Sequence, residues 1–72
     1  MVIIKLQSLI DSRGWAQREL SKEAEIRVAT INHMCNNASQ YLNITHLDSI
    51  CRVLNCRIED IMEYIPDEDI LQ

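Results

Sequence analysis

Five neighbouring residues carry side chains that can contact the edges of base pairs. An Asn amide can donate to and accept from an adenine edge at the same time, and small apolar side chains suit a thymine methyl group. Arg and His can donate to guanine or to a phosphate. The residues with this chemistry are Arg27, Val28, Ala29, Asn32 and His33. Helical periodicity would place the last four on one outward face, with Arg27 just before it.

A second set of residues could hold a phosphate backbone. Gln17 and Arg18 open the preceding segment, and the first amides and side chains of a helix are suited to binding phosphates. The other three candidates follow the first set along the chain: Asn36, Ser39 and Gln40. Asn36 could equally serve as a helix terminator, so both roles stay open for it.

Two short helices with a tight turn between them must position both sets. The apolar spacing predicts one helix over residues 17–24, which buries Leu20, and another over residues 28–36, with Ile31 and Met34 facing inward. Two helices joined in this way make a helix-turn-helix, which places its second helix in the major groove of DNA.

The segment before this motif predicts a short strand and one helix. Val2, Ile3 and Ile4 are β-branched and favour an edge strand. Helical apolar spacing then starts at Leu6, and Gly14 provides a left-handed stop.

The segment after the motif predicts two more helices. Thr45 and Asp48 have the spacing of a capping box at the start of the fourth helix, and Asn55 is a plausible left-handed terminator. Ile58, Ile61 and Met62 indicate a short fifth helix.

The composition limits the chain to one small domain. It has 72 residues, of which 47% are hydrophobic, with one Gly and one Pro. These values favour a compact helical fold, which we place at residues 1–66, followed by an acidic tail at 67–72. No apolar run is long enough for a membrane span or a signal peptide, so we expect no membrane partner and a cytoplasmic protein.

The net charge of −4 is divided unevenly along the chain. Residues 1–58 hold all seven Lys and Arg against five of the eleven acids, whereas residues 59–72 hold the other six acids and no base. The segment that carries the candidate contacts is therefore mildly basic, which predicts modest rather than tight non-specific binding to nucleic acid.

The sequence predicts no enzyme, no cofactor and no small-molecule substrate. It contains no Ser-His-Asp order, no paired-carboxylate motif and no Gly-rich phosphate loop. Cys35, Cys51 and Cys56 cannot all pair within one chain and favour free thiols in a reducing compartment. A zinc site built from Cys51, Cys56 and His46 lacks a recognised ligand spacing, so no metal is predicted either.

The order and spacing of these elements resemble the Cro and lambda-repressor type of helix-turn-helix domain, the XRE-like proteins. The resemblance extends from about Leu6 to Tyr64. Its carriers are residues 17–20, Ile26, Thr30, Ile31, Met34, Asn36 and 47–64. A compact bacterial and phage subgroup is similar at both ends, in the hydrophobic residues 1–4 and in the EYIPDE segment at 63–68.

This resemblance implies an all-α domain of five helices, with short strands near residues 2–4 and 63–65. It implies that double-stranded DNA is the partner and that the chain forms a homodimer, for which the N-terminal strand is a candidate surface.

The chain also departs from the family pattern. Glu25 stands in the turn where the family usually has Gly. Ala16, Arg27 and Arg57 stand at helix starts that usually carry Ser, Thr or Asp. The loop at 38–41 lacks the usual basic residues. These departures weaken the expected affinity for DNA more than they weaken the fold.

From the motif and the resemblance we expect a sequence-specific transcriptional regulator, acting as a repressor, with helix 28–36 in the major groove. The alternative is a protein-interaction module, such as an antitoxin-like or anti-repressor adaptor, that keeps the fold with weak or no DNA binding. The acidic end and the uncharged loop favour this alternative.

Overall fold

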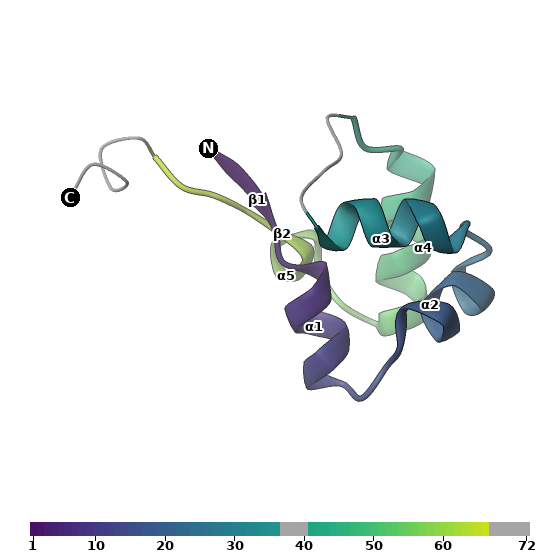
Figure 1. Ribbon diagram of the computed structural model, residues 1–72. Coiled ribbons are helices and arrows are strands. Elements are labelled where there is room, and N and C mark those ends of the chain that lie inside the picture. The colour runs from purple at the N-terminus through teal and green to yellow at the C-terminus, as the bar shows by residue number, and fades with distance from the viewer. Residues whose placement is uncertain (37–40, 67–72) are drawn as a thin grey trace.

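A computed structural model describes residues 1–36 and 41–66. This part of the chain folds into five helices that form one body, from which two short strands extend (Figure 1). The elements are β1 (Val2–Ile4), α1 (Leu6–Ser12), α2 (Gln17–Ala24), α3 (Val28–Cys35), α4 (Ile44–Leu54), α5 (Ile58–Ile61) and β2 (Met62–Tyr64). The predicted five-helix domain with terminal strands is thereby confirmed.

The two strands place residues 2–4 beside residues 62–64. They pair antiparallel, with Val2 opposite Tyr64 and Ile4 opposite Met62. The ladder continues one step further, where the backbone N–H of Ile65 donates to the Met1 carbonyl at 2.7 Å. Met62 was predicted to lie in the fifth helix, and this prediction was wrong. Its backbone is extended, with φ −142° and ψ 159°, because it pairs with Ile4.

The hydrophobic core lies where the five helices meet. Each helix contributes at least one buried side chain, and the buried set is Leu6, Ile10, Leu20, Ala24, Ile26, Ile31, Met34, Cys35, Ile50, Leu54 and Ile61. Trp15 is half-buried and packs against this set. Because α2 and α3 share the core with the other helices, their mutual orientation is fixed by packing.

Among the described residues, three adopt the left-handed backbone conformation: Gly14 and Asn55, where the sequence predicts it, and Glu25, which stands where the family usually has Gly. Gly14 has φ +72°, Glu25 has φ +57° and Asn55 has φ +50°. Gly takes this conformation without cost and Asn with little, whereas a Glu side chain is strained there. The turn between α2 and α3 therefore stores a small amount of strain.

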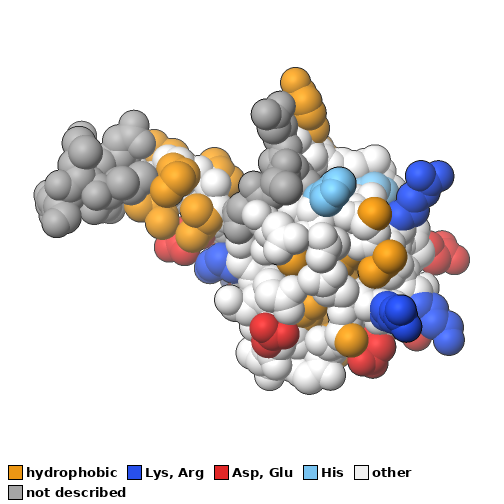
Figure 2. All heavy atoms as spheres, viewed as in Figure 1, with side chains coloured by type: hydrophobic (Ala, Val, Ile, Leu, Met, Phe, Trp, Pro, Cys, Tyr) orange, Lys and Arg blue, Asp and Glu red, His pale blue; other side chains and the backbone are white. Residues whose placement is uncertain are grey.

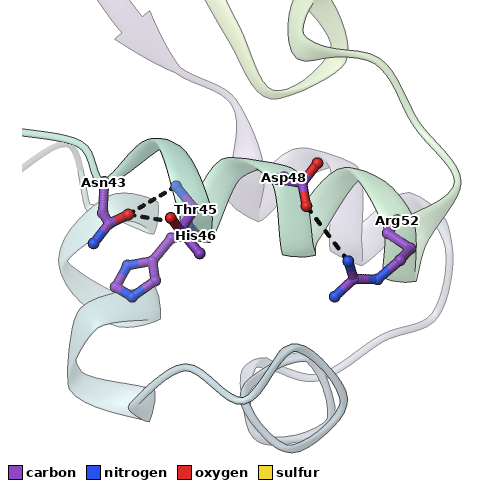
Figure 3. A network of polar contacts seen from close by, with 5 residues as sticks. All are labelled: Asn43, Thr45, His46, Asp48 and Arg52. Atoms are coloured by element: carbon purple, nitrogen blue, oxygen red, sulfur yellow. Dashed lines mark hydrogen bonds and ion pairs between the residues drawn. The ribbon is translucent and has the colours of Figure 1, made fainter.

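The predicted capping box at Thr45 and Asp48 was wrong, because α4 begins one residue earlier than Thr45. Asn43 is the N-cap, and its Oδ1 accepts from the backbone N–H groups of Thr45 at 2.8 Å and His46 at 3.3 Å (Figure 3). Asp48 lies too far into the helix to reach back. It faces Arg52 one turn later, at 3.4 Å.

Two of the three substituted caps, Ala16 and Arg57, are compensated in part. Ala16 has no side-chain acceptor, but Glu19 Oε1 accepts from the Ala16 backbone N–H at 3.2 Å. Asp60 Oδ2 likewise accepts from the Arg57 backbone N–H at 3.0 Å at the start of α5. Each helix start thus keeps one of the two bonds of a capping box.

Among the described residues, no helix is both long and apolar enough to cross a membrane.

Candidate nucleic-acid interface

The turn between α2 and α3 is built from Glu25, Ile26 and Arg27. Glu25 reverses the chain through its left-handed backbone. Ile26 is 4% exposed and anchors the turn in the core. Its backbone N–H donates to the Ser21 carbonyl at 3.0 Å, and the Ser21 hydroxyl donates back to the Ile26 carbonyl. These contacts fix where α3 begins relative to α2.

One face of α3 is buried and the other is open to solvent. Ile31, Met34 and Cys35 face the core. The outward side chains are exposed and are those predicted to contact bases: Arg27, Val28, Ala29, Asn32 and His33. The structure thus brings all five candidate base-contacting residues to one surface. The helix ends at Cys35 rather than at residue 36, with Asn36 as an exposed C-cap whose backbone is not left-handed.

The outward face of α3 has no negative charge of its own, since the helix sequence VATINHMC contains no Asp or Glu. In the view of Figure 2 this side of the molecule carries polar, apolar and His side chains, with Lys, Arg, Asp and Glu side chains around its border. Such a mixture suits hydrogen bonding and methyl contacts in a groove.

The wider motif is electrically balanced. Residues 17–36 contain three basic and three acidic side chains. The bases are Arg18, Lys22 and Arg27, and the acids are Glu19, Glu23 and Glu25. All six are exposed. The long-range attraction of this surface to phosphates is therefore small.

Two of the candidate phosphate contacts lie at the start of α2. Gln17 is the first residue of the helix and is half-buried, and Arg18 beside it is exposed. The first backbone N–H groups of a helix have no helical carbonyl to bind, so they remain donors for an anion. Of the other candidates, Asn36 lies at the end of α3, and Ser39 and Gln40 are outside the described residues.

Side-chain amides connect the two candidate sets directly. The Asn32 Nδ2 donates to Gln17 Oε1 at 3.2 Å, and the Asn36 Nδ2 donates to Asn32 Oδ1 at 3.0 Å. Gln17 Nε2 in turn donates to Gln7 Oε1 in α1 at 2.7 Å. Sequence reasoning missed the part played by Gln7. Of these three contacts, only the one between Asn32 and Asn36 could be predicted from the sequence, because residues four apart are neighbours on a helix.

The thiols of Cys35 and Cys56 are not activated. Burial, and more weakly the Asp11 carboxylate, raise the pKa of Cys35 to about 11. Burial and the neighbouring Cys51 raise the pKa of Cys56 to about 11 as well. A thiol must lose its proton to act as a nucleophile or a metal ligand. Within residues 1–36 and 41–66, no three His, Cys, Asp or Glu side chains form a group that could hold a metal ion.

Comparison with known proteins assigns this architecture to a family. The Cro/C1-type helix-turn-helix DNA-binding domain family matches residues 5–67. The HTH-type transcriptional regulator YozG of Bacillus subtilis strain 168 is 31% identical over 68 residues, which cover 94% of this chain and 81% of that protein. The crystal structure of the transcriptional regulator VanUg superposes with a TM-score of 0.73 at 30% identity, covering 90% of this chain and 85% of that one. The chain belongs to the Cro/C1-type helix-turn-helix DNA-binding domain family.

Proposed function

We propose that this DNA-binding regulator represses transcription by placing the outward face of α3 in the major groove of an operator. The observation that carries the proposal is the exposed, acid-free surface formed by Val28, Ala29, Asn32 and His33. Asn32 is suited to an adenine edge, His33 to guanine or phosphate, and the two small apolar residues to thymine methyl groups. Occupying an operator is sufficient for repression.

The second part of the proposal concerns the phosphate backbone. Gln17 and Arg18 approach the strand beside the groove through the start of α2, and Arg27 adds a charge next to α3. Asn36, Ser39 and Gln40 complete the proposed phosphate contacts. Positive and negative side chains balance across the motif, so its net charge attracts DNA little. The affinity must therefore come from these individual phosphate contacts.

The experiment is a selection from random duplex DNA followed by titration at several salt concentrations. Four to six phosphate contacts predict a slope of about −4 to −5 in a plot of log affinity against log salt. Combining Asn32→Ala with His33→Ala should remove discrimination between selected and random duplexes and leave the melting temperature unchanged. Arg18→Ala should instead weaken binding to all duplexes alike and reduce the slope by about one.

Two outcomes contradict the proposal. If the wild-type protein does not bind any duplex at about 50 mM salt, where phosphate contacts are strong, the protein-interaction alternative takes its place. If the Asn32→Ala, His33→Ala variant loses its cooperative melting transition, those side chains hold the fold together and are not the reading surface.

We further propose that two copies pair through the β1–β2 ribbon on a two-fold operator. One recognition helix contacts only a few base pairs, so pairing increases specificity. A two-stranded ribbon has two outer edges, and an isolated one is marginally stable in water. Here Val2 is 59% and Tyr64 67% exposed, which leaves apolar surface for a second copy to cover.

Sedimentation equilibrium without DNA tests this pairing. The wild type should sediment as a dimer, and Tyr64→Lys as a monomer, because an added charge on the ribbon opposes its burial. Tyr41→Lys is the matched control, since Tyr41 is 89% exposed and lies outside the ribbon. A monomeric wild type, or a dimer that Tyr64→Lys leaves intact, would refute pairing through the ribbon.

A further inference from the structure

Five side chains, four on three helices and one at the end of α3, form one continuous line of hydrogen bonds, which we name the amide relay. Its members are Asn36, Asn32, Gln17, Gln7 and Asp11. The relay begins at Asn36, the C-cap of α3, continues at Asn32 on α3, crosses to the start of α2 and ends on α1. Its four bonds measure 3.0, 3.2, 2.7 and 2.8 Å in that order, all within the normal range for N–H···O bonds.

The relay has a single direction because of its last member. An ionised carboxylate can accept hydrogen bonds but cannot donate them. Gln7 must therefore turn its NH₂ group toward Asp11, which leaves the Gln7 oxygen to accept from Gln17. The same constraint passes along the line, so that Gln17 turns its oxygen to Asn32, and Asn32 turns its oxygen to Asn36. Reversing one amide would bring two oxygens or two NH₂ groups together.

The direction of the relay decides what Asn32 offers to DNA. An amide has two N–H donors and two oxygen lone pairs. Asn32 uses one donor on Gln17 and one lone pair on Asn36, so one donor and one acceptor remain, each on a fixed side of the amide. An adenine edge presents an acceptor beside a donor, whereas a guanine edge presents two acceptors.

We infer that Asp11 and Gln7 are specificity-determining residues, which fix the orientation of the Asn32 amide through Gln17 without touching DNA. This inference rests on the proposed role of α3 in base reading. With the amide oriented, Asn32 pairs in two places with adenine in one orientation of the base pair and in at most one place with guanine. If the amide flips, its donor and acceptor exchange sides and the match is lost.

The first experiment compares duplexes selected from a random pool by the wild-type protein and by three variants. Gln7→Met keeps the size of the side chain and removes its polar atoms. Asp11→Asn lets the line run in either direction. Asp48→Asn is the matched control, because it removes the same charge from another exposed Asp, outside the relay. Stability is checked for each variant by thermal melting.

The expected result is a loss of preference at one base pair. Gln7→Met and Asp11→Asn should reduce discrimination about three- to tenfold, the equivalent of one net hydrogen bond, and only at the base pair where Asn32→Ala also does. Asp48→Asn should leave the preference unchanged. Suppose that the wild type selects a sequence, so that the proposed function holds. The inference is then overturned if the relay variants lose affinity for all duplexes alike, or if both keep the wild-type preference. If the wild type selects no sequence, the proposed function fails and the inference fails with it.

A second measurement examines the relay in the free protein. The side-chain NH₂ groups of Gln17 and Asn32 give separate NMR signals. Asp11→Asn should shift the signals of both groups, because it replaces a carboxylate that can only accept with an amide that can also donate, and Asp48→Asn should shift neither. If Asp11→Asn leaves the Asn32 signals unmoved, no relay connects the two residues, whatever the DNA experiment gives.

Discussion

Replacing Glu25 with Gly should stabilise this domain, although the change deletes a whole side chain. Glu25 ends α2 in the left-handed region, at φ +57° and ψ +44°. Its side chain is exposed, and within the described residues it makes no hydrogen bond or ion pair. The fold therefore keeps the backbone turn at this position and gains nothing from the side chain, so the strain is uncompensated.

The magnitude follows from two opposing terms. A left-handed conformation costs an L-residue about 1–2 kcal/mol relative to Gly. The greater freedom of Gly in the unfolded chain offsets about 0.4–1 kcal/mol of that gain. The free energy of unfolding should therefore be about 1 kcal/mol larger for Glu25→Gly than for the wild type, which raises the melting temperature of so small a domain by roughly 4–8 °C.

Thermal melting followed by circular dichroism measures this change, and two controls separate its causes. Glu25→Gln removes the charge and keeps the strain, so its melting temperature should stay close to that of the wild type. Asn55→Gly removes a left-handed residue that is already well tolerated, so its gain should be smaller. If Glu25→Gly is no more stable than Glu25→Gln, the backbone at this turn is not strained and the reasoning is refuted.

Two further predictions concern a helix cap and a buried thiol. Asn43→Ala should lower the free energy of unfolding by about 0.5–2 kcal/mol, because it removes the bonds to the backbone N–H groups of Thr45 and His46. Thr45→Ala should have little effect. Equal losses for the two variants in urea unfolding would contradict Asn43 as the cap. The pKa of Cys35 rises from 9.0 in the unfolded chain to about 11 in the folded one, so its contribution to stability is complete below pH 9 and is lost as the pH rises toward 11. The wild type should therefore lose more stability than Cys35→Ala between pH 8 and pH 10, by about 1.4 kcal/mol at most, and parallel losses in urea unfolding would argue against a perturbed thiol.

Most of the fold follows from patterns that depend on residues close together in sequence. Apolar residues three and four apart locate the helices, since the period of a helix is set locally. The same is true of Gly14 and Asn55, because few residue types tolerate a left-handed backbone. Thr45 was misassigned as the cap because Asn43, Thr45 and Asp48 all have suitable side chains. Which of them caps the helix depends on where the helix begins, and packing decides that position.

The candidate interface was predictable to a different degree. That Asn32 and His33 face outward follows from Ile31 and Met34 facing inward, which is again a matter of helical period. The bond from Asn32 to Gln17 spans 15 residues and exists only because the core sets how α2 and α3 cross. The sequence shows that Gln7 and Asp11, or Asn32 and Asn36, are four apart, but it does not show that Gln17 joins the two pairs.

The hydrogen bond between Asn32 and Gln17 bears on how a domain with balanced charge can discriminate among DNA sequences. A regulator that relies on Lys and Arg gains affinity for every duplex, and its specificity must exceed that general attraction. Here the three bases and three acids of the motif leave little general attraction. An amide held in one orientation loses less freedom when it binds, so a larger part of each hydrogen bond becomes discrimination. If Asn32 reads a base as we propose, low general affinity and an oriented amide act in the same direction, toward specificity.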